Sequence, residues 1–152
     1  MPVMAVDVRM SIEIARPRHQ VAEYVTNPDN AATWNANVTE VEWETTPPVD
    51  VGTRVVFVST CRGRTLRCSY EVQLVIPDQR FVMGSVGAPF PMETSYAWRD
   101  TRDGGTLMEL RSRSEPSGFS KLSAPLMRSA VRRASTKDLR RLKEILEEPG
   151  RP

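Results

Sequence analysis

The chain has 152 residues, of which 39% are hydrophobic and 26% are charged, and its formal net charge at pH 7 is +2. A chain of this length can bury a core without disulfides or metals, so we expect one domain over residues 1–152 with its core at about residues 6–147. No apolar run approaches the roughly 18 residues that a membrane-spanning helix needs, which excludes that class of protein.

The N-terminal segment predicts a strand rather than a targeting signal. Asp7 and Arg9 lie inside its only apolar stretch, and it lacks the basic start and cleavage site of a signal peptide, so we expect a cytoplasmic protein. From Val6 to Ile14, apolar and polar residues alternate. This period of two predicts a strand with one buried face.

Two short helices are predicted after this strand. The first begins near Pro17, because proline is tolerated in the first turn of a helix. The second has Asn27 as its N-cap and Pro28 at its first position, and it ends near Trp34.

The segment from Val38 to Arg113 reads as a meander of five or six strands, which with the first strand predicts an antiparallel sheet of about six to seven strands. Turn-forming residues separate the strands at positions 47–48, 63, 77–78, 87–91 and 103–105.

Hairpin parity indicates which residues of the first long hairpin share a face. A two-residue turn at Gly63-Arg64 would place apolar and small residues of both strands on one side. These are Val55, Phe57, Ser59 and Cys61 on one strand, and Leu66, Cys68, Tyr70, Val72 and Leu74 on the other.

The last hairpin gives the same result with a three-residue loop over residues 103–105. Arg99 then lies opposite Glu109 on a polar outer face, where Glu93, Arg111 and Arg113 form solvated ion pairs. An antiparallel sheet covered on one face has this division into an apolar and a polar side. The residues of the apolar side are Met92, Thr94, Tyr96, Trp98, Met108, Leu110, Ser112 and Ser114.

A C-terminal helix of about 23 residues, roughly 35 Å long, is predicted to cover this sheet. Ser123 is a suitable N-cap, and Pro125 would lie in the first turn. Residues 121–148 carry eight basic and four acidic side chains, a net charge of +4. The apolar residues that recur near helical spacing are Leu122, Leu126, Met127, Ala130, Val131, Ala134, Leu139, Leu142, Ile145 and Leu146.

Short motifs accompany this order of elements along nearly the whole chain. They are Ser11 to Ile14, Ala15 to Val21, Tyr24-Val25, Asn27 to Asn30, Trp34-Asn35, Val38 to Val41, Gly52-Thr53, Asp78 to Phe81, Gly104 to Thr106 and Asp138 to Lys143. Together they resemble the SRPBCC, or START-like, superfamily, and within it the polyketide cyclase/dehydrase type of small bacterial domain. The resemblance is specific for the fold and not for one activity.

The resemblance implies an α+β helix-grip fold, in which a curved antiparallel sheet wraps around the long C-terminal helix. The gap between sheet and helix would bind a hydrophobic or aromatic small molecule; the alternative is that the same residues fill a solid core. The predicted ligand-binding residues are Phe57, Ser59, Cys68, Tyr70, Met83, Met92, Tyr96, Trp98, Met108, Leu110, Ser112, Leu126, Met127 and Ala130.

Tyr70 and Tyr96 are the candidates for a catalytic role, because a phenol whose pKa is lowered by nearby positive charge can take part in proton transfer. The alternative for each is a buried tyrosine with one hydrogen bond. The spacing of Cys61 and Cys68 fits neither a zinc pair nor a CxxC motif, and His19 is the only histidine. We therefore expect no metal, no other cofactor and a surface position for His19.

Three functions remain open. The first is binding of a hydrophobic or aromatic small molecule, and the second is a cyclase, aromatase or dehydratase that positions a reactive chain in the same cavity without a metal or nucleotide. The third is an interaction module whose basic helix engages a partner. Acidic residues such as Asp138 and Glu144 interrupt the basic face of that helix, so we expect no nucleic-acid binding and no stable membrane insertion. We expect a monomer or a homodimer.

Overall fold

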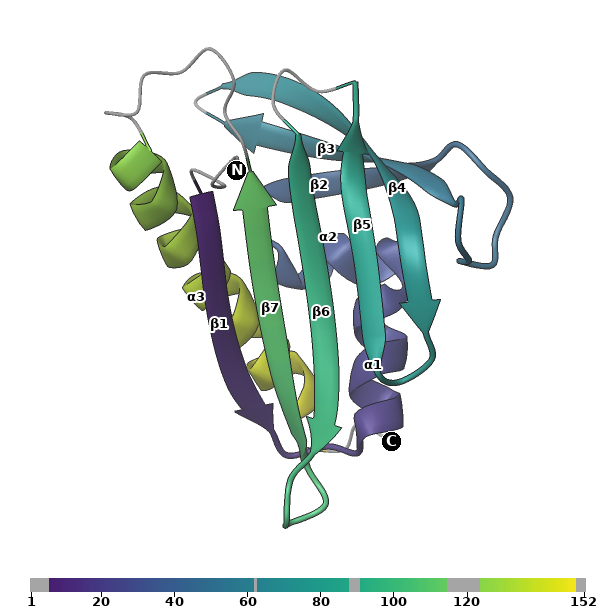
Figure 1. Ribbon diagram of the computed structural model, residues 1–152, viewed down its shortest axis with the longest axis vertical. Helices are drawn as coiled ribbons and strands as arrows, with labels where there is room; N and C mark the ends of the chain where they lie inside the picture. The colour runs from purple at the N-terminus through teal and green to yellow at the C-terminus, as the bar shows by residue number, and fades with distance from the viewer. Residues whose placement is uncertain (1–5, 62, 88–90, 115–123, 150–152) are drawn as a thin grey trace, which may run out of the picture.

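A computed structural model shows a curved, seven-stranded antiparallel sheet with helices on one face (Figure 1). It describes residues 6–61, 63–87, 91–114 and 124–149, without the side chains of Cys61 and Ala124. The predicted helix residues Leu122 and Ser123 lie outside these ranges. The elements are β1 (Val6–Ile14), α1 (Arg18–Thr26), η1 (Pro28–Asn30), α2 (Ala31–Trp34), β2 (Val38–Trp43), β3 (Arg54–Cys61), β4 (Arg64–Ile76), β5 (Arg80–Val86), β6 (Met92–Asp100), β7 (Thr106–Ser114) and α3 (Ala124–Leu146).

The strand order is β1-β7-β6-β5-β4-β3-β2, and every neighbouring pair is antiparallel. β1, β7, β6 and β5 run along the long axis of the molecule, whereas β2 and β3 cross its upper end (Figure 1). α3 lies behind β1 and β7, and α1 and α2 lie behind β5 and β6 (Figure 1). This arrangement confirms the predicted helix-grip α+β fold.

The β3–β4 hairpin has the predicted faces but a different turn. Cys61 pairs with Arg64, so the turn comes one residue earlier than predicted. The faces are unchanged because the pairing partner of each β3 residue shifts by two positions, which is one full period of a strand. Phe57 consequently pairs with Cys68, and Val55 pairs with Tyr70.

The prediction that Leu74 lies on the inner face is wrong. The register between β4 and β5 shifts between Val72 and Leu74, so that Leu74 pairs with Val82 on the outer face and Val75 pairs with Phe81 on the inner face. A bulge inserts one extra residue and therefore exchanges the two faces of the strand beyond it. Gln73 is the extra residue, and its side chain lies over Gly84, where a Cβ would come within 2.4 Å of Gln73 Nε2.

The β6–β7 hairpin also keeps the predicted faces, with a longer loop. Asp100 pairs with Thr106, so Arg99 lies opposite Leu107 instead of Glu109. Its guanidinium still reaches Glu109 diagonally, with an N–O distance of 2.8 Å. Arg113 lies directly opposite Glu93 and forms an ion pair with it, so these outer-face charges are the expected ion pairs.

The short helices close the lower part of the inner face. Asn27 caps η1 through its side chain, which accepts a hydrogen bond of 3.0 Å from the Asp29 amide, and Pro28 occupies the first helical position as predicted. The Trp43 indole of β2 donates to Asp29 Oδ1 over 2.8 Å and fixes η1 against the sheet. Trp34, the last residue of α2, is only 2% exposed.

α3 has the predicted length of 23 residues, and its two halves differ. In the C-terminal half, Leu139, Leu142 and Leu146 are buried in the core. In the N-terminal half, Leu126 is 75% exposed. Among the described residues, the hydrogen bonds that tie α3 to other elements begin at Thr136.

A cluster of polar contacts fixes the C-terminal end of α3 to β1 and the turn after it. Glu147 accepts a hydrogen bond of 2.7 Å from the Ala15 amide, and Lys143 Nζ donates to the Glu13 carbonyl over 2.7 Å. Arg16 donates to the Leu146 carbonyl over 2.6 Å, which satisfies one of the free carbonyls at the helix end. None of the described helices has the length and apolar content needed to cross a bilayer.

Candidate functional site

An aromatic cluster centred on Tyr96 fills the middle of the inner face. The Tyr96 ring makes an edge contact with Trp34 at a centroid distance of 6.1 Å and stacks on Phe81 at 6.3 Å. Trp98 follows on the same strand at 6.2 Å. The cluster joins α2 to β5 and β6, and such contacts add stability beyond the area that the rings bury.

A small pocket lies beside this cluster, between the α1–α2 segment and strands β3 to β6. Its volume is about 30 Å³, which matches the space of a single water molecule. Aromatic rings occupy most of the space that the fold leaves between its layers. Its lining includes Val25, Trp34, Asn35, Val55, Phe57, Val72, Phe81, Met83 and Tyr96.

Two polar groups of the lining residues have no partner. The Trp34 indole nitrogen is buried and has no acceptor in the part of the chain that the structure describes. The Tyr96 hydroxyl makes no hydrogen bond within those same ranges. A buried donor without an acceptor costs about 1–3 kcal/mol, so a bound molecule that offers an acceptor would recover this free energy.

Burial raises the pKa of both candidate tyrosines, that of Tyr70 to about 12. The pKa of Tyr96 is raised further, first by burial and then by the charges of Tyr70 and Asp138. The predicted lowering by positive charge is therefore wrong, because burial disfavours the phenolate. Both phenols stay protonated at neutral pH, where they can donate hydrogen bonds and are poor bases.

Asp138 is an acidic residue near this site that the sequence did not single out as a site residue. It lies on α3, and its Oδ1 accepts a hydrogen bond of 3.0 Å from the Ala36 amide. Burial raises the pKa of the Asp138 carboxyl, although the Ala36 hydrogen bond and Lys137 act in the opposite direction. Asp138 is thus a half-buried carboxyl that acts on Tyr96 through its charge and does not line the pocket.

The predicted ligand-binding residues separate into distinct groups. Only three line the small pocket: Phe57, Met83 and Tyr96. Buried in the solid core or beside it are Trp98, Met108, Leu110 and Ser112. Partly exposed are Ser59, Cys68, Tyr70, Met92 and Met127.

Leu126 and Ala130 do not face the pocket. Both lie on the exposed side of the N-terminal half of α3. The helical stripe that contacts the sheet passes instead through Met127, Val131 and Ala134, which are partly buried. The sequence pattern alone could not separate these positions, because Leu126 and Ala130 lie on the same apolar side of the helix as Met127, Val131 and Ala134.

Several pocket residues were missed because they come from the helical segment after β1. Val25 and Trp34 belong to α1 and α2, which the sequence analysis placed beside the sheet without assigning them to the pocket. The signal that could have found them is the Asn27-Pro28 turn. This turn begins the helical segment that ends at Trp34, which is buried on the inner face.

His19 lies at the surface, as predicted. Its side chain is 70% exposed, with Nε2 at 3.1 Å from Glu23 and Nδ1 at 3.2 Å from Asp78. These contacts join α1 to the β4–β5 turn and are remote from the pocket.

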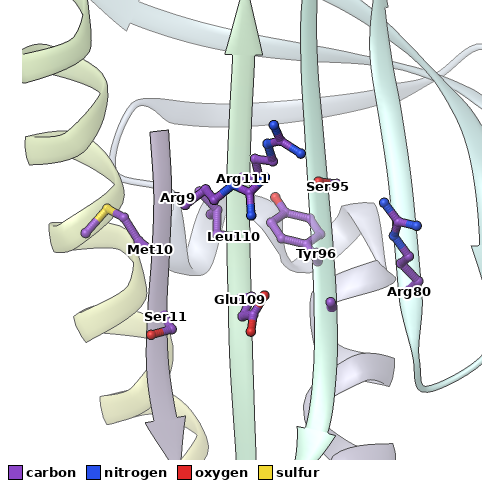
Figure 2. Close-up of a pocket in the computed structure, with 10 residues that line it drawn as sticks. Arg9, Met10, Ser11, Arg80, Ser95, Tyr96, Glu109, Leu110 and Arg111 are labelled. Atoms are coloured by element: carbon purple, nitrogen blue, oxygen red, sulfur yellow. The ribbon is translucent and has the colours of Figure 1, made fainter. Parts of the chain in front are cut away.

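A larger hollow, which we term the outer hollow, lies on the opposite face of the sheet. Its volume is about 530 Å³. Figure 2 shows Arg80 and Arg111 on either side of Ser95, with Arg9 and Glu109 nearby, while Tyr96 and Leu110 lie behind the strands. The outer hollow is polar and open to solvent, so it cannot be the apolar cavity that the fold predicts.

Comparison with known proteins identifies relatives of the whole chain. The sequence model of a family described as "polyketide cyclase / dehydrase and lipid transport" matches residues 5–147. No curated protein sequence matches significantly.

Solved structures with the same fold include proteins of different kinds. A Staphylococcus aureus protein of unknown function, SA2116, superposes with a TM-score of 0.77 at 17% identity, over 93% of each chain. A START superfamily protein from Mycobacterium smegmatis has a TM-score of 0.76 at 12% identity, over 93% of this chain and 97% of that one.

The di-domain ARO/CYC protein StfQ of the steffimycin biosynthetic pathway also has this fold, with a TM-score of 0.77 at 16% identity. The match covers 94% of this chain and 51% of StfQ. At these identities the structures share a fold, which by itself does not transfer an activity.

Proposed function

The chain belongs to the polyketide cyclase/dehydrase and lipid transport family of the START-like superfamily, and on that basis we propose that it binds a hydrophobic or aromatic small molecule between its sheet and its helices. The observation that carries this proposal is the buried Trp34 indole nitrogen, which has no acceptor among the described residues, at a largely apolar pocket that the Tyr96 phenol also lines.

These groups favour a ligand that is flat, largely apolar and equipped with a hydrogen-bond acceptor. The rings of Trp34, Phe81 and Tyr96 provide stacking and edge contacts for an aromatic body. A ketone, enone or quinone oxygen would accept hydrogen bonds from the indole and the phenol. Binding sites for small apolar ligands commonly combine aromatic side chains with a few well-placed polar groups of the protein.

The pocket must widen to admit such a ligand, because its volume is only about 30 Å³. Phe57 and Met83 are partly exposed and line it, so they are the side chains that can move aside. Met83 can change rotamer at little cost because its side chain is unbranched. The partly buried Met127 and Val131 of α3 lie in the half of the helix that is less firmly tied.

A matched pair of probes tests the proposal. 2-Acetylnaphthalene carries a ketone on a fused aromatic body, and 2-ethylnaphthalene has nearly the same shape without the acceptor. We expect isothermal titration calorimetry to show that the ketone binds about tenfold more tightly, the gain expected from one or two hydrogen bonds to buried donors.

The Tyr96→Phe variant should reduce this preference for the ketone, because it removes one of the two donors. Tyr24→Phe is the control, since the Tyr24 hydroxyl bonds to Thr33 Oγ1 at 2.6 Å outside the pocket, and it should leave the preference unchanged. Equal affinity for the two naphthalenes in the unmodified protein, or the same loss in both variants, would refute the role of the unpartnered donors.

A second candidate function, a cyclase, aromatase or dehydratase, is supported by Asp138. Its half-buried carboxyl, whose pKa burial raises, could exchange a proton with a ligand that Tyr96 orients as a neutral donor. The two functions separate when a ligand recovered from the protein is incubated with it again. An unchanged mass and absorption spectrum indicates binding alone, whereas a change that is lost in Asp138→Asn indicates catalysis.

A further inference from the structure

The outer hollow owes its shape to small side chains on the central strands. Ser95 and Ala97 of β6 form its floor, and Ser11 of β1 continues it across the sheet. Longer residues surround them. The hollow is therefore a depression in the sheet surface, and its position is fixed by the backbone register rather than by a mobile loop.

The register places the surrounding charges in two adjacent rows across the strands. In one row Arg9 pairs with Arg111, and Arg111 pairs with Ser95. In the next row Arg80 pairs with Ala97. Directly paired residues of antiparallel strands are only about 5 Å apart, so the arginines of β1, β5 and β7 enclose the floor (Figure 2).

Two of these arginines have no ionic partner in the described part of the chain. Arg111 donates to both carboxylate oxygens of Asp7, over 2.9 and 2.7 Å. Glu109 accepts from Arg99 over 2.8 Å. Arg9 and Arg80 make no ion pair with any residue that the structure describes.

The Asp7 carboxylate that bonds to Arg111 also interacts electrostatically with Arg9, without forming an ion pair with it. Arg9 lies directly opposite Arg111, and like charges on paired residues destabilise a sheet. The lining of the hollow contains three arginines and one glutamate, a net charge of +2. A bound group with two negative charges would neutralise this surplus.

We propose that the outer hollow is a binding site for a phosphate monoester, held by Arg9, Arg80 and Arg111 with the Ser95 hydroxyl as an additional donor. A phosphate monoester carries close to two negative charges at neutral pH, and its oxygens match the planar donor pattern of guanidinium groups. The hollow of about 530 Å³ also has room for the organic part of the ester.

This site is separate from the interior pocket, although the same strand serves both. Ser95 and Ala97 line the hollow and not the pocket, whereas Tyr96 between them lines both. Backbone amides of β6 can therefore report binding on either face. A ligand on the outer face is distinguished by the arginine variants, because those side chains do not reach the interior.

Phenyl phosphate is a suitable probe, and phenyl sulfate is its control, with nearly the same shape and one negative charge. In a titration followed by ¹⁵N–¹H NMR, we expect phenyl phosphate to shift the amides of Ser95, Ala97 and Arg111 saturably. Inorganic phosphate should compete. Phenyl sulfate should bind about tenfold more weakly, because it leaves one cation unneutralised.

Arg9→Gln and Arg80→Gln should each weaken binding of phenyl phosphate about tenfold. Both residues are exposed and unpaired, so neither change should disturb folding. Arg140→Gln removes the same charge from an exposed position on α3 and should change the affinity less than about twofold.

Three results would overturn the proposal. The first is the absence of saturable shifts with phenyl phosphate. The second is equal binding of phenyl sulfate, which would show that the site does not recognise a dianion. The third is an equal loss in Arg140→Gln, which would show that the protein attracts anions through its general charge alone.

Discussion

The Ala36 amide donates a hydrogen bond of 3.0 Å to Oδ1 of Asp138, and this contact ties the segment after α2 to the middle of α3. One turn further along, Arg141 Nε donates to the Thr33 carbonyl over 3.2 Å. Towards its N-terminus, α3 makes one further hydrogen bond to the sheet among the described residues, from Thr136 Oγ1 to Met10 Sδ over 3.8 Å, and none to α2. Asp138 therefore lies next to the boundary between the two halves of α3, since the hydrogen bonds from α3 to other elements begin at Thr136 among the described residues.

Asp138→Asn should make the protein more stable at neutral pH. Burial raises the pKa of Asp138, so its ionised form is unfavourable in the folded state, and asparagine keeps the oxygen that accepts from Ala36. A carboxyl whose pKa is higher in the folded than in the unfolded protein stabilises the fold when it is protonated, at a pH below its unfolded pKa. That stabilisation is lost as the pH rises through its folded pKa. The advantage of the variant should therefore shrink as the solution is acidified.

Asp7→Asn is the matched control with the opposite sign. A hydrogen bond from Arg111 holds the pKa of Asp7 below its usual value, so this residue stabilises the fold at neutral pH and loses that effect as pH falls through its folded pKa. Urea unfolding followed by circular dichroism between acid and neutral pH measures both variants. Parallel pH profiles for the two variants would contradict this account.

Tyr96→Phe should leave the free energy of unfolding unchanged or raise it by up to about 1 kcal/mol, because the lost hydroxyl has no partner within the described residues. Tyr24→Phe should lower it by about 1 kcal/mol, because it removes the bond to Thr33. Chemical denaturation of both variants tests the difference. A larger loss for Tyr96→Phe would show that its hydroxyl serves the fold rather than a ligand.

Leu142→Ala and Leu126→Ala compare the two halves of α3. Leu142 is completely buried, so its truncation should cost about 2–5 kcal/mol. Leu126 is 75% exposed, and its truncation should change the free energy of unfolding by less than about 0.5 kcal/mol. Thermal and urea unfolding provide the comparison. Similar costs at both positions would mean that the N-terminal half packs as tightly as the C-terminal half.

Glu147→Ala should destabilise the protein by about 1 kcal/mol at neutral pH, because it removes the acceptor for the Ala15 amide and for Lys143. Burial raises the pKa of Glu147, but these hydrogen bonds lower it more and hold it below its usual value. The cost should therefore decline as pH falls through that pKa. Glu144→Ala, at an exposed position one turn earlier, should have little effect at any pH.

The fold could be predicted because its main signals are periodic. The alternation from Val6 to Ile14 and the pattern of the two hairpins predict which side chains share a face of the sheet. That assignment stays the same when the register shifts by two residues. Leu74 was misplaced because a bulge has no signature in hydrophobic alternation. Arg99 was paired with the wrong neighbour because the length of a glycine-containing loop is not fixed by its composition.

The candidate site was less predictable because it depends on how far apart the layers lie. Parity correctly brought Phe57 and Tyr96 to the inner face, yet it could not show that the pocket between sheet and helices is as small as about 30 Å³. The roles of Trp34 and Asp138 follow from contacts between segments far apart in the chain. The outer hollow follows from side-chain size on adjacent strands, which becomes visible only once the register is known.

Native mass spectrometry of the protein purified gently from its own cells tests the central claim most directly. We expect a hydrophobic or aromatic compound at near-stoichiometric occupancy, released on denaturation, and a lower occupancy in Met83→Trp, where a larger side chain fills the pocket. A protein that is empty, and that also fails to bind either naphthalene probe, would contradict the claim that this pocket binds a small molecule.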